Sequence, residues 1–161
     1  MKILLLALLL FQQPQLLITE YDEFNDITKI KTGKLFVLDS EEEKIQFTFF
    51  TLCKGKQTRD CEKTPFAAIG VLLKSNDLTF SKGLKAIADG ERFDLGEATL
   101  LKTEPQDGAT FLSLVSLIPS EIFQKFGKAK TLKMQLGGVL TFSFNSDQIK
   151  AMRELAAKIE P

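Results

Sequence analysis

Histidine and tryptophan are absent from this chain of 161 residues, and tyrosine occurs only once. Histidine is the commonest catalytic base and a preferred ligand of zinc, so its absence argues against most nucleophilic triads and zinc sites. Exposed tryptophan and tyrosine are the usual stacking surfaces for sugars, so their scarcity weakens a glycan-binding hypothesis. Basic and acidic residues both number 21, and this balance gives no indication of a nucleic-acid partner.

The residues that are present are those of a folded globular chain. Hydrophobic residues make up 44% of the sequence and charged residues 26%, which differs from the composition of a disordered chain. The length allows one domain with one substantial core. Phenylalanine occurs 14 times and must supply much of that core.

The first eleven residues have the pattern of a secretory signal. Lys2 is followed by an unbroken apolar run over 3–11, as in the basic and hydrophobic regions of a signal peptide. Gln12 and Pro14 end this run short of the roughly 20 apolar residues that a spanning helix needs. We therefore predict a signal peptide over 1–16.

Cleavage anywhere between Phe11 and Thr19 fits, because no small-residue motif fixes the position. Removal of the signal peptide is expected to leave 17–161 as a single β-rich domain. We expect this domain to be secreted or periplasmic and to have no stable membrane span. Two alternatives stay open. In the first alternative, the N-terminal apolar segment is a buried strand or helix of the fold. In the second, it is an uncleaved membrane anchor.

Cys53 and Cys61 are the only cysteines, and seven residues separate them. This spacing differs from the two-residue gap of redox motifs and zinc knuckles, and without histidine a metal site lacks ligands. In an exported protein such a pair most simply forms a disulfide, here at the base of a polar loop. The alternative is two independent buried thiols.

Alternating or continuous apolar segments predict about eight strands joined by short turns. The predicted strands are 27–38, 45–52, 66–73, 84–88, 92–103, 110–118, 130–136 and 139–144. Gly33 marks a bulge or kink in the first of them. The dipeptides Asp89-Gly90 and Gly137-Gly138 predict hairpin turns.

Two helices complete the predicted fold. Ser120 can cap a short helix, and Gly127 can end it in a left-handed conformation. Residues 147–159 have the clearest helical pattern, and Asn145-Ser146 supplies its cap. The expected fold class is mainly β: an antiparallel sandwich or flattened barrel of about eight strands with one short helix and a C-terminal α-helix.

The C-terminal part combines a capped short helix, a glycine-turned hairpin and a terminal helix. These features lie in 118–138, 140–144, Gln148 and 152–155, and the start 21–28 and the turn 88–92 fit the same pattern. Over residues 21–159 the chain thus resembles small uncharacterised exported bacterial domains. The resemblance implies a bacterial, exported, β-rich domain with no assigned activity, and it carries over no functional residue.

Acidic residues form two clusters that could be catalytic or could bind calcium. One comprises Asp22, Glu23 and Asp26, and the other comprises Asp39, Glu41, Glu42 and Glu43. Two carboxylates suffice for a glycosidase, but neither cluster has the alternating oxygen ligands and central glycine of a calcium loop. Charged runs in turns are usually solvated, so we predict no catalytic residue, no metal ligand and no cofactor.

Two other groups of residues have both a simple and a functional interpretation. The basic segment Lys54–Arg59 could contact an anionic partner, although a solvated loop between the cysteines is the simpler interpretation. The phenylalanines at positions 47, 49, 142 and 144 have strand spacing. They form part of the core or line a cavity for a hydrophobic ligand.

The missing catalytic groups and the signal-like start together favour one function. We expect a non-enzymatic exported domain that acts by surface contact with an envelope or extracellular protein. The alternatives are a small carrier of hydrophobic ligands and a carboxylate-dependent hydrolase. A closed cavity would favour the carrier, and two acids facing each other in a cleft would favour the hydrolase.

Overall fold

Two antiparallel sheets and two helices make up the structure, a computed structural model that describes residues 16–39, 43–56, 58, 60–74, 81–106, 108–138 and 140–159. The larger sheet has seven strands in the order β1-β2-β4-β5-β9-β8, and β3 also pairs with β4. These strands are β1 Leu17–Asp22, β2 Ile27–Thr32, β3 Leu35–Asp39, β4 Glu43–Lys54, β5 Phe66–Leu73, β8 Thr99–Gln106 and β9 Ala109–Leu117.

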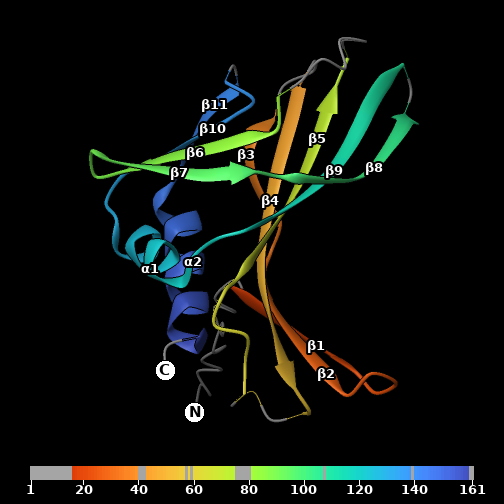
Figure 1. The fold of residues 1–161 in the computed structure, drawn as a ribbon, viewed down its shortest axis with the longest axis vertical. Coiled ribbons are helices and arrows are strands. Elements are labelled where there is room, and N and C mark those ends of the chain that lie inside the picture. The colour runs from red at the N-terminus through yellow and green to blue at the C-terminus, as the bar shows by residue number, and fades with distance from the viewer. Residues whose placement is uncertain are drawn as a thin grey trace, which may run out of the picture.

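The smaller sheet has four strands in the order β11-β10-β6-β7. Its strands are β6 Gly83–Ala88, β7 Glu91–Glu97, β10 Leu132–Leu136 and β11 Leu140–Phe144, and the helices are α1 Ser120–Lys128 and α2 Ser146–Ile159. Strands β6 and β7 run at a steep angle to the long strand β4, and both helices lie on the same side of the larger sheet as these two strands (Figure 1). The predicted mainly β fold, with antiparallel sheets packed as in a sandwich and a C-terminal helix, is confirmed.

The core lies between the larger sheet and the layer formed by the smaller sheet and the helices. Alternate residues of β4 point into it, and Ile45, Phe47 and Phe49 are completely buried. The ring of Phe47 lies 5.3 Å from that of Phe142 on β11, and the ring of Phe49 lies 5.4 Å from that of Phe123 on α1. Strand β4 therefore packs against both the smaller sheet and the helices.

The opposite face of the larger sheet remains partly open in the described part of the chain. Phe50 and Phe66 are cross-strand neighbours with stacked rings 5.0 Å apart. The ammonium of Lys29 lies 4.1 Å from the centre of the Phe50 ring. Leu117, opposite Phe66 on β9, is 55% exposed.

The described residues contain eleven strands, whereas the sequence predicts about eight. The predicted strand 27–38 is interrupted at Gly33 and becomes β2 and β3, which pair with opposite ends of β4. The predicted strand 92–103 is interrupted at Ala98, where the chain passes from the smaller sheet to the larger one. Strand β1 is an addition, and the predicted signal peptide lies outside the described residues except for Leu16.

The predicted ends of the first helix are wrong. Pro119, not Ser120, is the N-cap residue, and its carbonyl accepts hydrogen bonds from the N–H groups of Ile122 and Phe123. Gly127 lies within α1 and is buried, and it does not adopt a left-handed conformation. A Cβ atom at this position would lie 2.9 Å from Cα of Arg153 on α2. Gly127 is therefore a contact point between the two helices.

The predicted cap of the C-terminal helix is present. The side-chain oxygen of Asn145 accepts a hydrogen bond from the N–H of Gln148 at 2.9 Å, and Oε1 of Gln148 accepts one from the N–H of Asn145 at 2.8 Å. This reciprocal pair satisfies two donors at the helix start.

Candidate functional site

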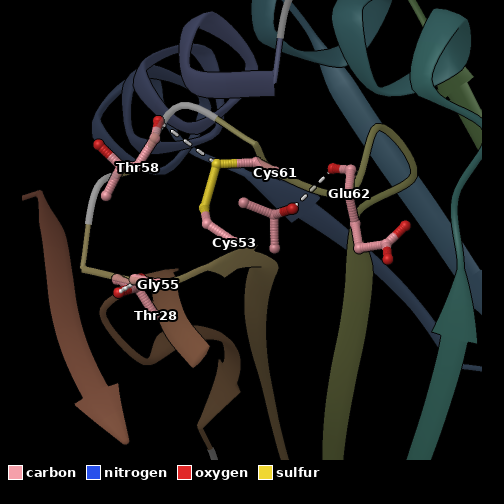
Figure 2. Close-up of a disulfide and its surroundings, with 7 residues drawn as sticks. Thr28, Cys53, Gly55, Thr58, Cys61 and Glu62 are labelled. Atoms are coloured by element: carbon pink, nitrogen blue, oxygen red, sulfur yellow. Dashed lines mark hydrogen bonds between the residues drawn. A yellow bond between two sulfur atoms is a disulfide. The ribbon is translucent and has the colours of Figure 1, made fainter. Parts of the chain in front are cut away.

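The Cys53–Cys61 disulfide lies at the end of the long strand β4, next to the β1–β2 hairpin (Figure 2). The predicted disulfide is thus present. The loop that it closes is held to β4 by hydrogen bonds from the N–H of Lys54 to the carbonyl of Asp60 and from the N–H of Glu62 to the carbonyl of Leu52. The hydroxyl of Thr28 donates to the carbonyl of Gly55, which joins the same loop to β2.

The lysines of this loop contact other residues of the same chain. The ammonium of Lys54 lies 3.9 Å from the carboxylate of Asp60, and that of Lys56 lies 5.1 Å from the centre of the Tyr21 ring. Of the predicted basic segment, Gln57 and Arg59 lie outside the described residues. The solvated, disulfide-closed loop is therefore the better interpretation of this segment.

The first acidic cluster stabilises the turn of the β1–β2 hairpin. Asp22 accepts hydrogen bonds from the side-chain amide of Asn25 and from the N–H of Phe24, and these bonds lower the pKa of Asp22. The hydroxyl of Tyr21 donates to Asp26 at 2.8 Å, which raises the pKa of Tyr21. These side chains are exposed, and their hydrogen bonds are those of a turn.

The second acidic cluster falls partly outside the described residues, because 40–42 are not among them. Among the residues that are described, no group of three or more acidic or cysteine side chains is arranged to bind a metal ion.

The four phenylalanines that could line a cavity contact one another instead. The ring of Phe47 lies within 5.7 Å of those of Phe49, Phe142 and Phe144. All four side chains are buried, and Phe47 and Phe49 are completely so. They fill the space between the sheets where the sequence allowed a ligand cavity, so their role is packing.

A groove of about 630 Å³ lies on the outer face of the smaller sheet. Leu84, Ala86, Leu132 and Met134 are buried on the inner face of β6 and β10, so the alternate residues of both strands point outward. Residues of all four strands line the groove, among them Lys85, Ile87, Arg92, Asp94, Lys133, Gln135 and Thr141.

Three of these residues are cations without a partner in the described part of the chain. Lys85 and Ile87 lie on β6, and Lys133 of β10 and Arg92 of β7 are the cross-strand neighbours of Ile87 on its two sides. None of the three cations makes an ion pair or a side-chain hydrogen bond with another described residue.

Asp94 is the only carboxylate among the lining residues, and it is directed toward the backbone. It lies opposite Lys85 in the β6–β7 pairing, but its Oδ1 accepts a hydrogen bond from the N–H of Gly96 at 3.0 Å. The lining thus holds three positive charges and one negative charge, an excess of two positive charges. Such a concave patch attracts anions.

The sequence pattern identified these residues only in part. The predicted strand 130–136 alternates apolar and polar residues, and this alternation places Lys133 and Gln135 on its outward face. The missing information was that β10 pairs with β6, because this pairing joins segments far apart in the chain. The signal that could have been used is the set of cations at outward positions of three predicted strands.

Comparison of the chain with protein-family models, curated proteins and solved structures finds no match. The resemblance to exported bacterial domains therefore stays a prediction. No helix in the described ranges is both long and apolar enough to cross a membrane. The disulfide is compatible with an extracellular or periplasmic location.

Proposed function

We propose that the protein is an exported, non-enzymatic binding domain whose groove on the smaller sheet holds an anionic part of an envelope or extracellular protein. The observation that carries this proposal is the convergence of Lys85, Arg92 and Lys133 on one concave surface without partners among the described residues. Cations arranged in this way increase the association rate with an anionic partner and select against cationic ones.

The chemistry of the lining supports binding rather than catalysis. The single lining carboxylate, Asp94, accepts a backbone hydrogen bond and has no second acid opposite it in the groove. The hydroxyl of Thr141 accepts a hydrogen bond from Gln135, and neither lysine of the lining is hydrogen-bonded to it. Hydrolysis by two carboxylates or by an activated hydroxyl would need such a pair.

Two further features support the export part of the proposal. The first eleven residues have the pattern of a signal peptide, and the only two cysteines are joined. We do not propose the hydrophobic-ligand carrier, because the phenylalanines expected to line its cavity fill the core.

Titration with an acidic polypeptide tests the binding proposal directly. The probe is fluorescently labelled poly-glutamate at low ionic strength, measured against the wild type and against the triple variant K85Q/R92Q/K133Q. We expect the triple variant to bind between about threefold and about 100-fold more weakly, since each of the three exposed charge pairs contributes roughly 0.2–1 kcal/mol. The wild-type affinity should also fall as salt is added.

The control variant K63Q/K74Q/K150Q removes the same number of charges at exposed lysines outside the groove lining. It should bind poly-glutamate within about twofold of the wild type at the same ionic strength. Equal loss in both triple variants would mean that net charge alone drives binding, and it would contradict the proposed groove.

A further inference from the structure

We infer that the ligand of the groove is an extended peptide in which an apolar residue lies between two acidic residues. This inference rests on the proposed function and adds the chemical class of the ligand. It is carried by Ile87, an apolar side chain that is 40% exposed in the middle of the three cations. A ligand that paired only with the charges would leave this side chain without an apolar partner.

The sheet register sets the spacing that the ligand must match. Lys133, Ile87 and Arg92 form one row across β10, β6 and β7. Neighbouring strands lie about 4.8 Å apart, so the backbone positions of the two cations are about 10 Å apart with Ile87 between them. Lys85 lies two residues from Ile87 on the same strand, about 7 Å away.

An extended peptide satisfies this pattern with alternate residues. Its side chains at positions i, i+2 and i+4 point to the same side, at intervals of about 7 Å. An acid–apolar–acid pattern at these positions places an apolar group over Ile87 and a carboxylate within reach of the long side chains on either side. A sulfated or phosphorylated polymer would instead place polar or charged groups over Ile87, where they would lose hydration.

Gln135 provides a second indication of a peptide. Its side-chain nitrogen donates to the carbonyl of Gly138 at 3.1 Å and to the hydroxyl of Thr141 at 3.4 Å. These bonds hold the amide in the lining of the groove, where Lys85 is the cross-strand neighbour of Gln135. Its Oε1 atom has no donor among the described residues and is available to a backbone N–H of the ligand.

The test uses labelled peptides in which serine separates the residues that matter. The first has the pattern Glu-Ser-Leu-Ser-Glu, the second replaces leucine by serine, and the third replaces both glutamates by glutamine. We expect the first to bind the wild type most tightly, with about fivefold loss without leucine and about tenfold loss without the acids. Heparin and polyphosphate are compared as unlabelled competitors and should displace the first peptide less well than unlabelled copies of that peptide.

Substitution of Ile87 separates the apolar contact from the charges. In I87S the first and second peptides should bind equally, because the partner of the leucine is gone. Ile18 on β1 is 38% exposed and is absent from the groove lining, so I18S serves as the matched control and should keep the fivefold difference. Thermal unfolding of both variants checks that each remains folded.

The outcomes distinguish this inference from the proposal on which it rests. If the acidic probes depend on the three cations but leucine and Ile87 have no effect, or if heparin or polyphosphate competes better than the peptide, the peptide inference is overturned and the anion-binding groove stands. If no acidic probe distinguishes the wild type from K85Q/R92Q/K133Q, both are overturned.

Discussion

Gly127 lies at a close approach of the two helices. A Cβ atom there would lie 2.9 Å from Cα and 3.2 Å from N of Arg153, and backbone atoms on a packed helix cannot move away cheaply. The side chain of Arg153 also donates a hydrogen bond to the carbonyl of Gly127 at 2.6 Å. The close approach and this bond fix the position of α1 on α2.

We predict that Gly127→Ala destabilises the protein although alanine favours helices. Separation of the two backbones should cost about 1–3 kcal/mol, more than the roughly 1 kcal/mol that alanine gains in helix propensity. Urea unfolding measures the difference. Gly33→Ala is the control, because a Cβ atom added at Gly33 would have no neighbour within 4 Å and the φ of Gly33 is not in the left-handed region. A G127A variant that is as stable as the wild type would show that the helices can separate at no cost.

At the scale of elements, the β6–β7 hairpin is joined to the segment between α1 and β10 through Asp89. Its carboxylate accepts hydrogen bonds from the N–H groups of Thr131, at 2.8 Å, and Lys130, at 3.0 Å. These two backbone bonds hold the pKa of Asp89 below its usual value of 3.8. The turn thereby helps to place β6 beside β10, and so positions the groove.

We predict that Asp89→Asn lowers the melting temperature at neutral pH and weakens its dependence on acid. A lowered folded-state pKa means that the charged carboxylate stabilises the fold above the unfolded pKa near 4, and that this contribution disappears as the pH falls through the folded pKa. Asparagine tolerates the left-handed conformation at this position, where φ is 48°, but carries no charge. When the melting temperatures of the wild type and of Asp89→Asn are plotted against pH from pH 7 to pH 2, the two curves should therefore converge at the acid end. Parallel curves would contradict the role given to the carboxylate.

The strand pairings that were predictable from sequence are those between strands adjacent in the chain. The turns at Asp89-Gly90 and Gly137-Gly138 have positive φ values and join neighbouring strands, as the dipeptides predicted. The role of Gly127 could not be predicted from sequence, because glycine is required there by a contact with Arg153 on another helix. Prediction of the groove would have required knowledge that β10 pairs with β6, and local sequence patterns do not contain this information.

At the scale of the whole molecule, the long strand β4 connects the part of the larger sheet that contains β1 and β2 to the part that contains β3. It pairs with β2 near Cys53, with β3 at its other end and with β5 along its length from Glu43 to Phe50. Tyr21, on the β1–β2 hairpin, is the only tyrosine of a chain that has no tryptophan. Tyrosine fluorescence thus reports on the hairpin end alone, whereas far-ultraviolet circular dichroism reports on all strands and helices.

We predict that urea unfolding followed by these two signals gives coincident transitions. Because β2 pairs with the same strand whose side chains form the core, the hairpin end cannot unfold without loss of contacts to β4. Reduction of the Cys53–Cys61 disulfide should move both transitions together to lower urea concentration. The free energy of unfolding should fall by about 2–3 kcal/mol, the contribution expected for so short a closed loop. If reduction shifted only the fluorescence transition, the hairpin end would be a separate unit, and the prediction of one domain over 17–161 would fail.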